Sequence, residues 1–136
     1  MTYSYISKIK WSSKENVHGT LELDCGYSFD FHKPSEFGGK DELMNPEDAF
    51  VGAVAMCYSI TFQEMCRKMR LDIEDFELHT EGILEKVNDK MMITKIILSP
   101  KVKSRNDNNK IQKALRLAEK NCLITRSINS DIVLKN

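Results

Sequence analysis

The sequence has few of the residues that build metal-bound or cross-linked proteins. It contains four cysteines and three histidines, but no two cysteines are spaced as C-x-x-C and the histidines do not cluster with them. A zinc site is therefore not expected, and we predict no bound metal. Only three prolines and six glycines occur in 136 residues, and there is no internal repeat. We expect a single domain over residues 1–136, large enough to bury a core.

Net charge is also lacking. Lys plus Arg and Asp plus Glu number 20 each, which argues against nucleic acid or an anionic membrane as the main partner. The first residues, MTYSYISKIKW, contain no apolar core of signal-peptide length. We therefore expect a cytoplasmic protein. Its cysteines are then reduced, catalytic or inert rather than joined in a static disulfide framework.

The longest regular pattern covers residues 45–70, NPEDAFVGAVAMCYSITFQEMCRKMR. Asn45 is a good N-cap, and Pro46 suits the first helical position. The run from Phe50 to Ile60 is almost wholly apolar, and helices that are apolar all round are buried ones. Its ends are too polar, and its apolar run too short, to span a membrane. The pattern predicts a buried central helix with other elements wrapped around it.

The rest of the chain predicts strands and a second helix. Alternating apolar residues and turn signals place strands at residues 3–11, 20–25, 27–31, 76–87, 91–102 and 131–134. A second helix, capped within residues 106–109, carries an apolar stripe that ends at Cys122. Strands grouped in runs, with two helices, indicate an α+β fold with antiparallel sheets. Because these elements cannot cover so apolar a helix, we expect an obligate homodimer that closes over it.

The four cysteines differ in their surroundings. Cys57 lies among apolar residues midway along the central helix, so it is either a small packed hydrophobe or a reactive thiolate. A thiolate would need a cation from elsewhere in the fold or from a partner chain. Cys122 has more polar neighbours. Cys66 lies about half a helical rotation from Cys57 and cannot meet it, and Cys25 is interpreted as a packing residue in a strand.

Glu47 is by default a partner of the helix dipole, because it lies in the first turn of the central helix. It precedes Cys57 by ten residues, about 15 Å along the axis, which is too far for direct contact. Two such helices packed in opposite directions in a dimer would bring Glu47 of one chain to Cys57 of the other.

Four sequence features together resemble the OsmC/Ohr family of hydroperoxide-reducing proteins. The segments are PSEFGGKDELMNPEDAFVGAVAMCYSITF and, near the C-terminus, AEKNCLITRSI. The features, in chain order, are Gly38-Gly39, Asn45-Pro46-Glu47, Cys57, and Ala118-Glu119 leading to Cys122. The resemblance implies two intertwined subunits with their central helices at the dimer core and two sites at the interface.

The resemblance also implies a thiol-dependent peroxidase for alkyl or lipid hydroperoxides. Cys57 would attack the peroxide, and Cys122 would resolve the resulting sulfenic acid as a disulfide. No bound cofactor is expected; an external dithiol such as a lipoyl group would regenerate the thiols. Four apolar residues would line the substrate pocket or simply belong to the core: Phe50, Val54, Tyr58 and Phe62.

One family feature is missing. In the family, an arginine in the connector after the first strand activates the thiolate, and Glu47 would help to hold it. The connector here, SSKENVHG, has no arginine; Lys14 is the nearest basic residue, followed by His18. Lysine supplies charge without the planar fork of arginine, so the chain resembles a divergent OsmC-like member. The alternatives are a non-catalytic protein of this fold that binds a small apolar ligand, and a thiol redox sensor.

Overall fold

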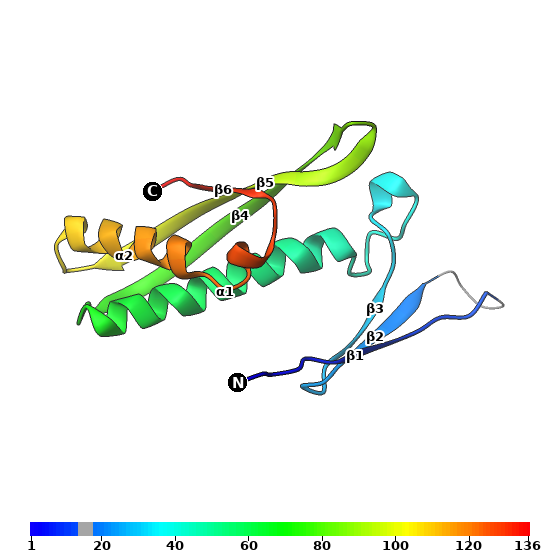
Figure 1. Ribbon diagram of the computed structural model, residues 1–136, viewed down its shortest axis with the longest axis horizontal. Coiled ribbons are helices and arrows are strands. Elements are labelled where there is room, and N and C mark those ends of the chain that lie inside the picture. Colours follow the sequence, from blue (N-terminus) through cyan, green and yellow to red (C-terminus); the bar gives the residue numbers. More distant parts are fainter. Residues whose placement is uncertain (14–17) are drawn as a thin grey trace. The chain divides into compact units, whose positions relative to one another are not determined.

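The structure, a computed structural model, describes residues 1–13 and 18–136 (Figure 1). The predicted site residue Lys14 lies outside the described residues. Contacts divide the chain into two compact units, Met1–Ala49 and Phe50–Asn136, which are described in turn. The elements are β1 (Ser7–Lys10), β2 (Gly19–Leu23), β3 (Ser28–Phe31), η1 (Ser35–Phe37), α1 (Pro46–Lys68), β4 (Ile73–Val87), β5 (Lys90–Ser104), α2 (Asn108–Asn121), η2 (Thr125–Ser127) and β6 (Asp131–Leu134).

The first unit contains an antiparallel sheet in the order β1-β2-β3. The β2–β3 turn passes through Gly26, whose φ of 102° is open to glycine. This confirms the predicted turn, but it corrects the interpretation of Cys25. That residue lies in the turn and is exposed, because β2 ends at Leu23.

The loop before α1 needs both of its glycines, for different reasons. Gly38 has a φ of 90°, which few other residues adopt readily. Gly39 has no such φ, but a Cβ there would lie 1.6 Å from the carbonyl oxygen of Lys33. Glycine is therefore needed at position 38 for its backbone conformation and at position 39 because the backbone of Lys33 comes close.

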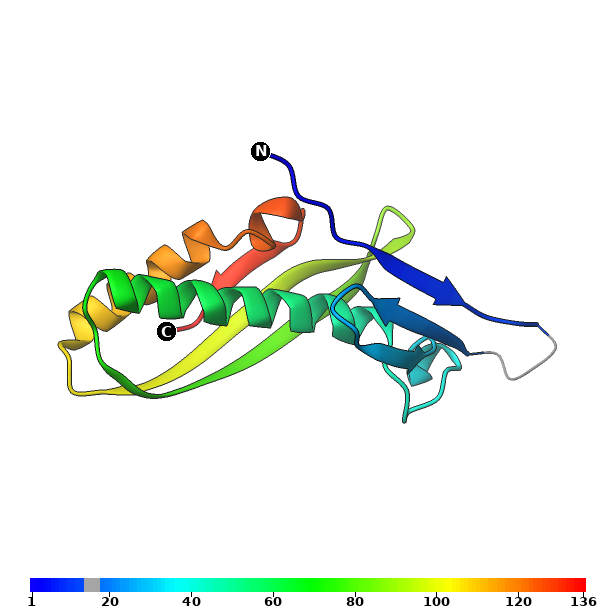
Figure 2. The same cartoon turned by 90° about the horizontal axis from the view of Figure 1, so that it is seen from below.

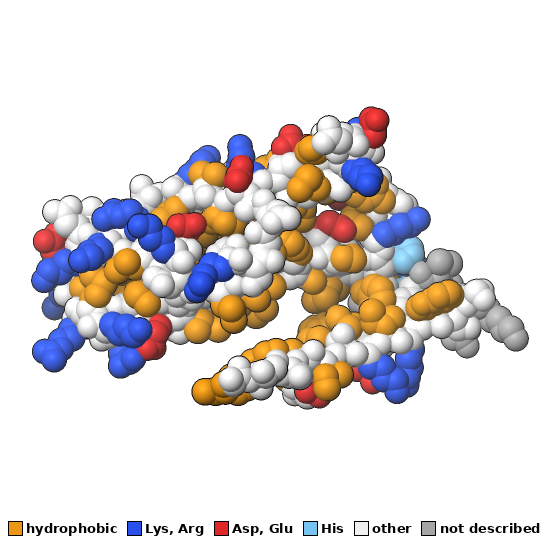
Figure 3. All heavy atoms as spheres, in the orientation of Figure 1, with side chains coloured by type: hydrophobic (Ala, Val, Ile, Leu, Met, Phe, Trp, Pro, Cys, Tyr) orange, Lys and Arg blue, Asp and Glu red, His pale blue; other side chains and the backbone are white. Residues whose placement is uncertain are grey.

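Helix α1 begins as predicted but is not buried on every side within one chain. The Asn45 side chain caps it by accepting the N–H of Asp48 at 2.7 Å. Every fourth residue from Val54 to Cys66 is buried, whereas Met56 and Ile60 are 64% and 65% exposed. Hydrophobic side chains reach the surface along this helix in Figure 3. Complete burial fails because α2 and the sheet cover one face only.

By length and mean hydropathy alone, α1 is apolar enough to cross a membrane, contrary to the expectation from the sequence. One such helix is weak support for a membrane span, because the core helices of soluble proteins meet the same criterion. The buried stripe of α1 packs in a protein core.

The second unit has a sheet in the order β4-β5-β6. Strands β4 and β5 form the predicted antiparallel hairpin, and its turn places Asn88 and Asp89 at positive φ. Such a turn matches the twist of the flanking strands. Strand β6, however, pairs parallel with β5. The antiparallel expectation is wrong for this pair, because the chain returns through α2, the kind of crossover that parallel strands require.

Helices α1 and α2 share one hydrophobic core with the central strand β5 (Figure 2). Ile96 and Leu98 of β5 alternate toward it and are fully buried. The hydroxyl of Tyr58 on α1 donates to the carbonyl oxygen of Leu115 on α2 at 3.0 Å, so this buried polar group is satisfied. The core thereby fixes how α1 and α2 lie against each other.

Gly82 of β4 lets α1 approach the sheet, since a Cβ there would lie 2.6 Å from Cγ2 of Val51. We predict that Gly82→Ala lowers the free energy of unfolding by about 1–2 kcal/mol, because overpacking exceeds the gain from a stiffer unfolded chain. Urea unfolding of Gly82→Ala, Val51→Ala and the double variant measures this. The double variant should lose less than the sum of the single losses; strict additivity, or a fully stable Gly82→Ala, would contradict the contact.

Candidate active site

The thiols of Cys57 and Cys122 lie within hydrogen-bonding distance of each other, and both are free. Helix α1 holds Cys57 near its midpoint, and Cys122 is the C-cap of α2. The hydrogen bond from Tyr58 to Leu115 joins the two helices one residue after Cys57. Two residues far apart in sequence are thus held together by helix packing.

The chain after Cys122 surrounds the Cys57 sulfur with neutral donors. Helix α2 ends at Cys122, which has an extended conformation. The backbone N–H groups of Leu123 and Ile124 then lie within hydrogen-bonding reach of the Cys57 sulfur, as does the hydroxyl of Thr61 from α1 itself. Convergent donors of this kind stabilise an anion.

The two thiols differ in acidity. Burial alone would raise the pKa of Cys57, but hydrogen bonds from the Cys122 thiol, the Ile124 and Leu123 amides and the Thr61 hydroxyl outweigh it and leave that pKa below its ordinary value. Burial raises the pKa of Cys122, and the neighbouring Cys57 raises it further. Cys57 is therefore the thiol that ionises first, while Cys122 keeps its proton and donates it in the hydrogen bond.

Among the described residues, no lysine, arginine or histidine contributes to the lowered pKa of Cys57. The acidity of Cys57 in this part of the chain comes from neutral donors rather than from a cation. His18, the second basic residue of the connector, lies in the first unit, with its Nε2 3.9 Å from Oδ2 of Asp30.

Glu47 lies in the first turn of α1, ten positions before Cys57 on the same helix. Its Oε2 atom is buried and accepts no hydrogen bond from the residues described. A buried carboxylate oxygen without a donor is unfavourable, so this atom needs a donor from outside the described set.

The residues expected to line a substrate pocket lie in or against the core. Val54, Tyr58 and Phe62 are at most 1% exposed, and Phe50 packs against them. Their spacing of four places them on the helix face that meets the sheet and α2. Phe62 also contributes to a cavity of about 690 Å³ between the end of α1 and the start of β4. The alternative that these residues are core is the one that the structure favours.

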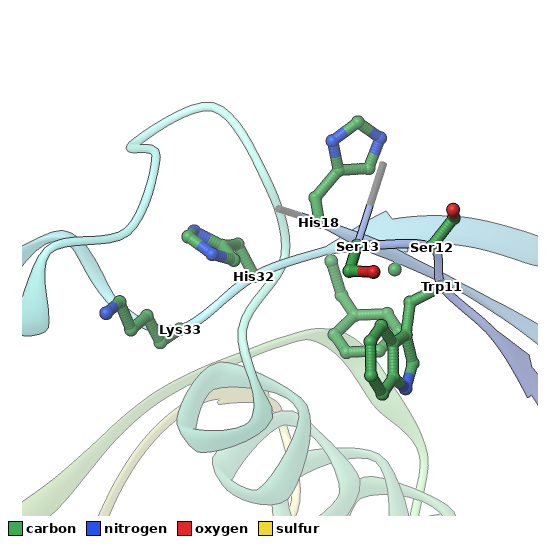
Figure 4. Close-up of a pocket in the computed structure, with 8 residues that line it drawn as sticks. Trp11, Ser12, Ser13, His18, His32 and Lys33 are labelled. Atoms are coloured by element: carbon green, nitrogen blue, oxygen red, sulfur yellow. The ribbon is translucent and has the colours of Figure 1, made fainter. Parts of the chain in front are cut away.

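A pocket of about 380 Å³ lies in the first unit, far in sequence from Cys57 and Cys122 (Figure 4). Trp11 and Phe31 form its apolar part, and His18 and His32 its polar part. No three potential metal ligands gather within residues 1–13 and 18–136. The other two cysteines do not join the pair: Cys66 is buried with a raised pKa, and Cys25 is exposed.

Three of the hydrogen-bond donors to Cys57 were not predicted from the sequence: the Thr61 hydroxyl and the amides of Leu123 and Ile124. Thr61 offered a signal, because it follows Cys57 by four residues and so lies on the same side of the helix. Nothing in the sequence indicated the amides of Leu123 and Ile124, because nearly every residue type carries a backbone N–H.

Comparisons with known proteins bear on the family and the fold of this chain. The sequence model of the OsmC-like protein family matches residues 39–135. An uncharacterised protein of Bacillus subtilis (strain 168), YmaD, is 30% identical over 98% of this chain and 91% of its own length.

Solved structures show the same fold. An OsmC-like protein of unknown function from Vibrio cholerae has a TM-score of 0.89 at 23% identity, covering 98% of this chain and 99% of its own. The organic hydroperoxide resistance protein OhrB of Bacillus subtilis has a TM-score of 0.75 at 21% identity, with coverages of 98% and 97%. The α+β fold expected from the resemblance is confirmed, and the chain belongs to the OsmC-like protein family.

Proposed function

We propose that the protein is a thiol-dependent peroxidase that reduces alkyl or lipid hydroperoxides to alcohols. The observation that carries this proposal is that Cys57, whose pKa is lowered, lies within hydrogen-bonding distance of Cys122, whose pKa is raised. Structural relatives named as organic hydroperoxide resistance proteins, from Bacillus subtilis and Legionella pneumophila, support the substrate class.

The peroxidase reaction has three steps: attack on the peroxide, formation of the disulfide and reduction of the disulfide. The Cys57 thiolate attacks the terminal oxygen of the hydroperoxide, the O–O bond breaks, and the alkoxide takes a proton and leaves as the alcohol. Cys57 is now a sulfenic acid, which condenses with the Cys122 thiol to a disulfide and releases water. An external dithiol, for which a lipoyl group is our candidate, then reduces the disulfide by exchange. The protein itself needs no bound cofactor for these steps.

The neutral donors explain how Cys57 ionises without the arginine of the family. The amides of Leu123 and Ile124 are fixed by the end of α2, so they need no reorganisation when charge appears on sulfur. Cys122 has a second role, because the same thiol that stabilises the thiolate lies within reach for its sulfur to resolve the sulfenic acid. We further propose that Lys14 adds positive charge near Cys57.

We also propose that the protein works as an intertwined homodimer, in which Glu47 of one chain serves the site of its partner. Two observations support this. Met56 and Ile60 form an exposed apolar face on α1, and large exposed apolar patches are typical of interfaces. The buried, unpaired Oε2 of Glu47 needs a donor that the described chain does not supply.

A second candidate function is non-catalytic binding of a small apolar ligand. The connector without arginine and the apolar part of the 380 Å³ pocket favour it. It requires a Cys57 that does not react with hydroperoxides, so the first experiment below separates the two functions.

Reduced protein treated with cumene hydroperoxide should consume about one equivalent and form a Cys57–Cys122 disulfide, as mapped on peptides. Cys57→Ser should abolish peroxide loss, and Cys122→Ser should stop at a sulfenic acid that dimedone traps, because no resolving thiol remains. Cys66→Ala, which removes a buried thiol outside the pair, is the matched control. An unchanged peroxide concentration together with four free thiols would refute the peroxidase.

The acidity of Cys57 should depend on the proton held by Cys122. Cys122→Ala removes a donor to the thiolate, so the pKa of Cys57 rises and its alkylation by iodoacetamide at neutral pH slows about ten-fold. Cys122→Ser keeps a hydroxyl donor and should retain most of the rate. The rate is measured at the Cys57 peptide by mass spectrometry. Equal rates in both variants and the wild type would mean that the Cys122 proton does not act on Cys57.

Sedimentation equilibrium at micromolar concentration should give the mass of a dimer. Ile60→Glu should shift the protein toward the monomer, because a carboxylate placed in an apolar interface loses its hydration. Lys113→Glu, which places a carboxylate at an exposed position of α2, should leave the dimer intact. A monomeric wild type would contradict the interface proposal but leave the chemistry of the two thiols open.

A further inference from the structure

Thr61 lies one helical turn beyond Cys57 on α1. Its hydroxyl donates a hydrogen bond of 2.7 Å to the carbonyl oxygen of Cys57, and it also lies within hydrogen-bonding reach of the Cys57 sulfur. A threonine hydroxyl carries one proton. It can therefore serve only one of these two acceptors on the same residue at a time.

The charge on the Cys57 sulfur decides whether the Thr61 hydroxyl donates its hydrogen bond to that sulfur or to the Cys57 carbonyl oxygen. A neutral thiol is a weak acceptor, so the carbonyl oxygen keeps the hydroxyl. A thiolate attracts donors strongly, since hydrogen bonds to ionised groups are about twice as strong as neutral ones. The carbonyl oxygen of Cys57 is not left unpaired by the change, because within α1 it also accepts the backbone N–H of Thr61.

The threonine side chain is suited to such an exchange. In helices it divides between two χ1 rotamers, one of which lets its oxygen reach the carbonyl one turn earlier. Thr61 is only partly buried, so the side chain is not locked in the core as Tyr58 and Phe62 are.

We propose that Thr61 is a positioning residue for Cys57, which turns its hydroxyl from the Cys57 carbonyl oxygen to the Cys57 sulfur when the thiol ionises. The proposal deepens the proposed function, on whose reactive thiolate it rests. It concerns the ionisation of Cys57 alone, so it is tested without any hydroperoxide, and its failure is distinguishable from failure of the peroxidase.

Few other ionisable groups bear on this thiol. From α2, the Cys122 thiol faces it directly. Tyr58, the next residue on α1, directs its hydroxyl to Leu115, and Glu119 of α2 acts on Tyr58. Among the described residues, Leu123 and Ile124 just before η2 offer backbone N–H groups, and no charged side chain of the sheet contributes to the pKa of Cys57. A change in its ionisation on altering Thr61 is therefore attributable to the hydroxyl.

A purely structural role for Thr61 predicts something different. Threonine hydroxyls often bond back to the helix backbone, and losing that bond alters stability without altering the pH at which a thiol ionises. The pH profile of Cys57 alkylation separates the two roles.

The experiment compares Thr61→Val, which has nearly the same shape without the hydroxyl, with Thr61→Ser, which keeps it. Iodoacetamide alkylation of the Cys57 peptide is followed from pH 5 to pH 10. Thr61→Val should move the midpoint to higher pH and slow alkylation at neutral pH about three- to five-fold. The effect is of this size because the hydroxyl binds the thiolate more strongly than it binds the carbonyl oxygen when the thiol is neutral. Thr61→Ser should restore the wild-type midpoint.

Ser59→Ala is the matched control, because it removes another hydroxyl from α1 that does not contribute to the pKa of Cys57; its profile should match the wild type. If Thr61→Val does not fold, Thr61→Ala replaces it with the same expected shift, since alanine favours the helix. An unchanged midpoint in the folded variant, or a Thr61→Ser profile that follows the valine variant, would overturn the proposal.

Discussion

The packing of α1 against α2 is the constraint on which the site depends, because it brings the thiols of Cys57 and Cys122 within hydrogen-bonding distance. The two helices share one core, where the small residues Ala114 and Ala118 are fully buried. The hydrogen bond from Tyr58 to Leu115 fixes this packing next to Cys57. A core that is rigid at this point keeps the two sulfurs close enough for chemistry without any loop movement.

The same arrangement gives different roles to two residues of the same type, Cys57 and Cys122. Cys57 lies on a partly exposed helix face with several donors directed at it, so its anion is stabilised. Cys122 is wholly buried, and burial raises its pKa. Environment rather than residue identity therefore assigns the nucleophile and the resolving thiol, as it does in other enzymes where two titratable groups of one type have separated pKa values.

Several parts of this structure could be predicted from residues alone. Asn45 and Pro46 marked the start of α1, and Asn88 and Asp89 marked the hairpin turn, because caps and turns have local chemical causes. The parallel pairing of β6 could not be predicted, since it depends on where the crossover through α2 returns. The exposed apolar face of α1 agrees with the expectation that the elements of one chain cannot cover this helix. Which molecule covers that face stays a prediction, because an apolar run does not identify its partner.

The site was predictable to a similar extent. The resemblance to a family identified Cys57 and Cys122, which spacing alone left as packed hydrophobes or reactive thiols. The sequence could not decide whether Phe50, Val54, Tyr58 and Phe62 line a substrate pocket or belong to the core, because a spacing of four along an apolar helix is typical of both. The backbone donors after Cys122 depend on how α2 ends, which only the fold reveals.

The most direct test of the account is an equilibrium redox titration of the native protein in glutathione buffers, read by intact mass and peptide mapping. We expect one two-electron step that joins Cys57 to Cys122 while the circular dichroism of the fold is retained. A disulfide that involves Cys25 or Cys66 instead, or a Cys57–Cys122 bond that forms only after denaturant is added, would contradict it.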